Sequence, residues 1–98
     1  MLGLFAKNRI QTQVASELRR EHGLGFFDAR KLASTVDDDA IRTAAATCSE
    51  PVQSKVAELF APQGLGDGSI LQAILDFLNS PLGQELLKAL MKLLLGLI

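Results

Sequence analysis

The sequence has no tryptophan or tyrosine, and only five of its 98 residues are phenylalanine. Its formal net charge is −1, from ten basic and eleven acidic residues. Nucleic-acid binding depends on a clustered basic surface, and binding of single strands also uses aromatic side chains as stacking platforms. The composition therefore argues against a nucleic-acid partner.

The chain also has only one cysteine, Cys48, and one histidine, His22. A lone cysteine cannot form an internal disulfide or a cysteine-based metal cage, and it is typical of a reducing compartment. Cys48 and His22 would form a catalytic pair only if the fold brought them together; the simpler interpretation is a core thiol and a surface imidazole. Phosphate-loop, H-x-x-x-H and G-x-S-x-G motifs are missing. We therefore expect no enzyme activity, no cofactor and no small-molecule substrate.

Three consecutive aspartates, residues 37–39, are the one candidate for a cation site. Metal loops distribute their oxygen ligands over a turn that bends at glycine, whereas these aspartates are contiguous and lead into a helix. We therefore expect no metal. The N-terminal MLGLF is too short an apolar stretch for a secretory signal. The expected location is intracellular or within an assembly, and it includes the periphery of a membrane.

Apolar residues recur at helical spacing along almost the whole chain, and no stretch alternates with a period of two. Ile10, Val14 and Leu18 mark one such stripe, and the later segments repeat the spacing. Residues that commonly start or stop helices punctuate the pattern; they are Asn8, Gly23, Asp37, Ser69 and Ser80-Pro81. The sequence thus predicts an all-α fold.

A segment rich in glycine, residues 62–68, separates two parts of the chain. The pattern predicts a helical unit over residues 1–61 and a hydrophobic helical hairpin over residues 69–98, joined by this linker. The two units either pack together or move separately.

The stretch VASELRREHGLGFFDARKLAS, residues 14–34, carries a helix with Glu-Leu-Arg at 17–19, a Gly-x-Gly turn at 23–25 and a Phe-Phe-Asp sequence at 26–28. Arg30, Lys31 and Leu32 follow. This pattern resembles the N-terminal module of bacterial elongation factor Ts, which is a ubiquitin-associated (UBA)-like three-helix bundle. The resemblance implies a compact interaction domain. The nucleotide-exchange core of that factor has no counterpart here, so no exchange activity is implied.

The resemblance also directs attention to the turn at residues 23–27, because such modules often present this loop to a protein partner. We expect Phe26 to fill the core of the helical unit. For Leu24 and Phe27, core packing and partner binding both remain open.

The last helix, LGQELLKALMKLLLGLI, is apolar around about two thirds of its circumference. A helix that packs on a small domain needs an apolar stripe of only ~100°, so this helix should be covered on two sides. The preceding helix covers one side. The other side could be covered by the first unit of the same chain, by another protein chain or by a membrane surface. The helix is too short to span a bilayer, so a membrane would cover it only from the surface.

We take the protein partner, or self-association through the hairpin, as the leading interpretation. It makes this chain a non-catalytic structural or adaptor subunit of a larger assembly, such as a minor virion subunit. One alternative is a membrane-active protein of the holin or lytic kind, and another is a UBA-like binder of a translation factor or ubiquitin-like partner. The expected partner-binding residues are Leu24, Phe27, Leu86, Leu87, Leu90, Met91, Leu94, Leu97 and Ile98.

Overall fold

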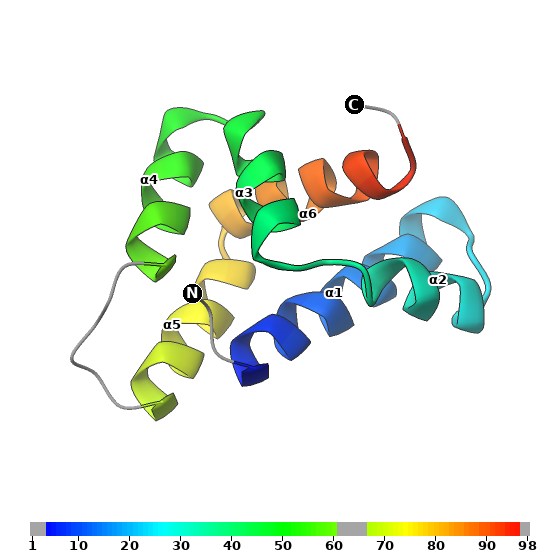
Figure 1. The fold of residues 1–98 in the computed structure, drawn as a ribbon, viewed down its shortest axis with the longest axis horizontal. Coiled ribbons are helices and arrows are strands. Elements are labelled where there is room, and N and C mark those ends of the chain that lie inside the picture. Colours follow the sequence, from blue (N-terminus) through cyan, green and yellow to red (C-terminus); the bar gives the residue numbers. More distant parts are fainter. Residues whose placement is uncertain (1–3, 61–66, 97–98) are drawn as a thin grey trace.

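The computed structural model describes residues 4–60 and 67–96, and these form six α-helices with no strand among them (Figure 1). The all-α class is therefore confirmed. In chain order the helices are α1 (Leu4–His22), α2 (Phe26–Ala33), α3 (Asp38–Ala46), α4 (Glu50–Phe60), α5 (Asp67–Leu78) and α6 (Pro81–Leu94).

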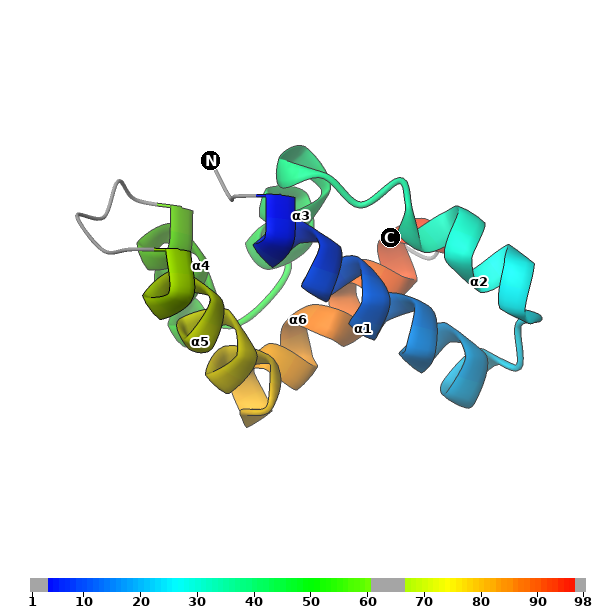
Figure 2. The ribbon, with the colours of Figure 1, turned by 90° about the horizontal axis from the view of Figure 1, so that it is seen from below.

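The helices form an elongated globule of 39 × 25 × 21 Å. The hairpin of α1 and α2 makes one end of the long axis, and α4 and α5 lie side by side at the other end (Figures 1 and 2). Between the two ends runs α6, which contacts α1, α3, α4 and α5. The last helix is therefore the centre of the molecule.

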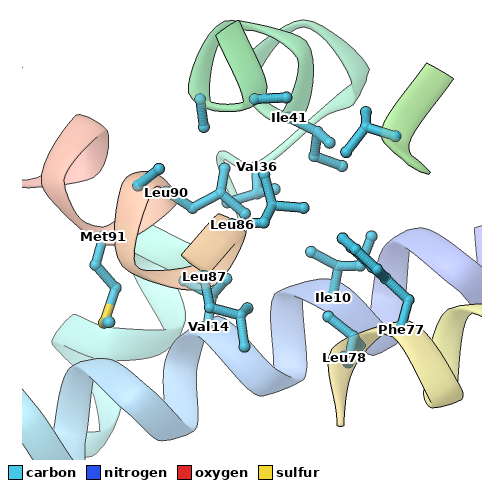
Figure 3. Close-up of a cluster of buried hydrophobic side chains, with 14 of the residues drawn as sticks. Ile10, Val14, Val36, Ile41, Phe77, Leu78, Leu86, Leu87, Leu90 and Met91 are labelled. Carbon is cyan, nitrogen blue, oxygen red and sulfur yellow. The ribbon is translucent and has the colours of Figure 1, made fainter. Parts of the chain in front are cut away.

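The apolar residues of α6 face these four helices. In Figure 3, Leu86 and Leu90 lie toward the Val36 side of the core and Leu87 lies toward Val14 of α1. This corrects the expectation that four residues of this helix form a surface for a partner, because all four are buried in the chain's own core: Leu86, Leu87, Leu90 and Met91. The wide apolar arc is covered on two sides, as its width requires, but helices of the same chain provide the cover.

Helices from both predicted units share a single hydrophobic core. The α1–α2 hairpin packs on α5 and α6, and α3 packs mainly on α6 and α4. The first three helices therefore do not close a bundle of their own, and of the two arrangements left open for the predicted units, the described helices pack together. The middle of the predicted linker, residues 62–66, lies outside the described residues, as do Leu97, Ile98 and the start of MLGLF.

Several helix ends follow the predicted signals. The Asp37 side chain accepts a hydrogen bond from the Ala40 amide at 2.8 Å and caps α3. Ser80 does the same for α6 through the Gly83 amide, and Pro81 takes the first helical position. Gly23 follows the end of α1 with a φ of +68°, a left-handed conformation that favours glycine.

Two predicted caps are wrong, because the helices begin earlier than expected. Asn8 lies inside α1, where its carbonyl accepts a hydrogen bond from the Thr12 hydroxyl at 2.9 Å. Ser69 lies inside α5, which begins at Asp67. Both residues are good caps in isolation, but the backbone continues as helix on their N-terminal side.

Candidate functional site

The turn between α1 and α2 lies at one end of the molecule (Figure 1), and two phenylalanines follow it directly. Phe26 and Phe27 are the first two residues of α2, and their side chains are 48% and 83% exposed. They are the only large apolar side chains that are exposed among the residues whose side chains the structure describes. The prediction that Phe26 fills the core is therefore wrong.

The reason lies in the register of α2. This helix buries the small side chains Ala29 and Ala33 against α1. Residues that share this face are three or four positions apart, and Phe26 lies at the edge of the stripe while Phe27 lies beyond it. The Phe26 side chain therefore lies at the rim of the α1–α2 interface and outside the core.

The turn that carries the two rings is held by backbone hydrogen bonds. The Leu24 amide donates to the Leu18 carbonyl at 3.4 Å, and the Ala29 amide donates to the Gly25 carbonyl at 3.0 Å. Leu24 itself is partly buried and packs on the core. Of the two residues left open between core and partner, Leu24 thus covers the end of the core and Phe27 is presented to solvent.

The two rings contact each other edge to face, with centroids 5.3 Å apart and planes at 88°. This arrangement brings the positive edge of one ring to the negative face of the other and is favourable for an aromatic pair.

Two arginines flank Phe26. The guanidinium carbon of Arg19 lies 5.3 Å from the ring centroid, and that of Arg30 lies 5.6 Å from it. Both distances are in the range of cation–π attraction. These arginines were missed at the sequence level, because their proximity depends on how the turn folds α2 back along α1.

The other predicted site residues within the described part of the chain belong to α6. Leu94 of α6 is half-buried and packs against the core, and the buried residues of α6 lie in the centre of the molecule. Among the nine residues expected to bind a partner, Phe27 is the one that the structure presents to solvent within the described part of the chain.

Cys48 and His22 are at different ends of the molecule. His22 ends α1 next to the aromatic turn, whereas Cys48 lies in the α3–α4 connection (Figure 1). The Cys48 thiol is partly buried and donates to the Ala44 carbonyl at 3.4 Å. Burial, and then the negative charge of Glu85, raise the pKa of this thiol. A raised pKa reduces the thiolate fraction and therefore the nucleophilicity of the group.

Glu85 of α6 contacts the residue that precedes α4. Its carboxylate accepts hydrogen bonds from the backbone amide of Ser49 at 2.6 Å and from the Ser49 hydroxyl at 2.9 Å. Ser49 immediately precedes α4, so the carboxylate also lies at the positive end of that helix. A residue 36 positions away thus caps α4, which sequence spacing alone does not reveal.

Replacing Glu85 by glutamine should therefore have two effects. The unfolding free energy should fall by about 1 kcal/mol, because a charged hydrogen bond to a helix start becomes a neutral one. The pKa of Cys48 should also fall, because a nearby negative charge is removed, so iodoacetamide should alkylate Cys48 at lower pH than in the unchanged protein. A pH profile of alkylation in both proteins measures the shift, and the exposed Lys88→Gln serves as a control. An unchanged profile would contradict the placement of Glu85 beside the thiol.

Among the residues that the structure describes, no three His, Cys, Asp or Glu side chains cluster as a metal site would require. The helices within residues 4–60 and 67–96 include none with the length and apolar character needed to cross a membrane.

Comparison of the chain with protein-family models, with curated proteins and with solved structures gives no significant match. The resemblance of residues 14–34 to the elongation factor module stays a prediction, and the function has to be argued from the residues themselves.

Proposed function

We propose that this chain is a non-catalytic adaptor subunit that binds a protein partner through Phe26 and Phe27 at the α1–α2 turn. The observation that carries the proposal is the exposure of Phe27, at 83%, beside a second half-exposed ring, in a chain that buries its other described large apolar residues at least in part. Burial of a phenylalanine side chain is worth about 1.5–3 kcal/mol, and aromatic residues are common anchors of protein interfaces. A partner that covers both rings would gain this free energy.

The rigid setting of the pair adds to the argument. Phe27 stands at the start of a helix whose alanine face is buried, and the preceding turn is held by backbone hydrogen bonds. An anchor that is already ordered loses little conformational entropy when it binds. The proposal thus retains the adaptor role expected from the sequence. It assigns the partner-binding surface to the α1–α2 turn, where the sequence analysis had assigned it to the C-terminal helix.

Two observations favour binding over catalysis. The raised pKa of Cys48 makes its thiol a poor nucleophile, and the fold keeps His22 far from it.

A photo-reactive phenylalanine analogue at position 27 tests this proposal in the cells that produce the chain. Its ring replaces an exposed ring, so folding should be unaffected, and irradiation should give a covalent adduct of one defined mass with another protein. The same analogue at Lys88, an exposed position of α6, is the matched control and should give no such adduct.

The other outcomes are equally informative. No adduct at position 27, in a chain whose thermal unfolding is unchanged, would contradict the proposal. An adduct of two copies of this chain would make the surface a self-association site, and cross-linking to lipid would favour the membrane-surface alternative.

A further inference from the structure

A groove with a volume of about 490 Å³ runs between α1 and α2 and ends at Phe26. One stripe from each helix lines it, since its residues recur at intervals of three and four positions. They are Asn8, Gln11, Thr12, Ala15, Ser16 and Arg19 from α1 and Phe26, Arg30, Ala33 and Ser34 from α2 and its end.

The charge of the groove has one sign. Arg19 and Arg30 are its only charged lining residues, and no carboxylate lines it. Within the described part of the chain neither arginine has an ion pair, whereas Arg20 is paired with Glu17 and contacts Glu21. Both guanidinium groups contact the Phe26 ring, and a cation–π contact leaves their N–H groups able to donate hydrogen bonds. These donors are therefore ready for an anionic group.

The shape suits an extended peptide segment. Ala15 and Ala33 line the groove between the two helices, and their small side chains leave the space that the groove occupies. From Asn8 to Arg19 the α1 wall rises about 16 Å at ~1.5 Å per residue, which corresponds to about five residues of extended chain. The far wall is fixed, because the Gln11 side chain donates to the Val36 carbonyl at 2.8 Å and ties the end of α2 to α1.

We propose that this groove binds an acidic, extended segment of the protein partner. Carboxylate side chains of the segment bind the guanidinium groups of Arg19 and Arg30, and an apolar side chain between them packs on Phe26 and the alanines. Arginine matches carboxylate geometry with two parallel hydrogen bonds. This inference rests on the proposed function, and it adds the chemistry of the partner.

Charge complementarity favours a peptide over a nucleic acid. A nucleic acid presents a continuous row of phosphates, whereas the groove holds two cations and its surroundings include the exposed acidic residues Glu21 and Asp28. A short segment with two or three carboxylates makes use of both arginines without meeting these acids.

The test is selection of random displayed heptapeptides on the full-length chain. We expect the selected peptides to be enriched in Asp and Glu around an aromatic or aliphatic residue. Affinities are then measured by fluorescence polarisation of the best labelled peptide. The double variant Arg19→Glu/Arg30→Glu should weaken its binding more than tenfold, and replacing the peptide's acidic residues by lysine should restore binding to that variant.

Arg9→Glu is the matched control, because Arg9 is exposed on α1 but does not line the groove, and its effect should be less than threefold. The thermal unfolding midpoint of each variant is compared with that of the parent to check that the fold is retained. If the midpoint of the double variant is much lower, Arg19→Gln/Arg30→Gln replaces it.

Peptides without acidic enrichment, or binding that survives the double reversal, would overturn the acidic-segment inference. Peptide binding to a Phe27→Asp variant distinguishes failure of the acidic-segment inference from failure of the proposed function. Selected peptides that lose binding with Phe27→Asp but not with the charge reversal leave the adaptor surface standing and remove only the groove. A selection that yields no peptide dependent on either site counts against both.

Discussion

Replacing Gly83 by alanine is expected to lower the free energy of unfolding by at least about 2 kcal/mol, although alanine is the better helix former. A Cβ atom at this position would lie 1.9 Å from the Phe77 carbonyl oxygen and 2.7 Å from the Leu78 Cα. Both atoms belong to the backbone at the end of α5, so no side-chain rotation relieves the overlap. The gain of about 1 kcal/mol in helix propensity is smaller than the cost of moving α5 away from α6.

Thermal and urea unfolding followed by circular dichroism measure the change, and the midpoint should fall by about 10 °C. The matched control is Gly25→Ala. Gly25 has a φ of −67°, which alanine adopts readily, and no atom lies within 4 Å of its would-be Cβ. That variant should be as stable as the parent or slightly more so. Equal stability of the two variants would contradict the close approach of α5 and α6.

Local signals in the sequence account for much of the secondary structure. Asp37, Ser80-Pro81 and Gly23 act within a few residues of themselves, through hydrogen bonds or backbone conformation that depend little on the rest of the fold. The apolar periodicity likewise identifies which side of a helix is buried. Both kinds of signal are readable from one sequence, and most of them were confirmed; the caps at Asn8 and Ser69 and the burial of Phe26 were wrong.

What covers a buried face is not a local property. The width of the apolar arc on α6 correctly indicated cover on two sides, but the pattern is the same whether the cover comes from the same chain, from another chain or from a lipid surface. The choice depends on how the α1–α2 hairpin and α3 fold back over α6, and these contacts join residues far apart in the sequence. The link between Glu85 and Ser49 was missed for the same reason.

The aromatic turn shows a further limit. Phe26 was placed in the core because it lies at helical spacing on the apolar stripe of its segment, yet its side chain is 48% exposed. Helical spacing indicates which residues share a face of a helix, but not how far a neighbouring helix covers that face. The same exclusion from the core creates the exposed pair and gives Arg19 and Arg30 a shared ring to contact.

Leu90→Ala should lower the free energy of unfolding by about 3 kcal/mol, a large part of the roughly 5–15 kcal/mol expected for a domain. Leu90 is completely buried at the middle of α6, where helices from both halves of the chain meet. Truncation to alanine removes its contacts and leaves a cavity that four neighbouring helices cannot easily fill. Urea unfolding measures the loss, and Lys88→Ala, two positions away and exposed, should change stability by less than about 0.5 kcal/mol.

The dependence on protein concentration decides between the two possible roles of Leu90. If its cover comes from the same chain, the loss of stability is the same at every concentration, because unfolding of a monomer is unimolecular. If a second copy covered Leu90, the parent protein would become less stable on dilution and the variant would lose that dependence. We expect stability that does not change with concentration in both proteins, since α1, α3, α4 and α5 already occupy the sides of α6. A parent protein that loses stability on dilution, together with a Leu90→Ala variant that does not, would return the C-terminal helix to the role of an interface and leave Phe27 as a second contact rather than the principal one.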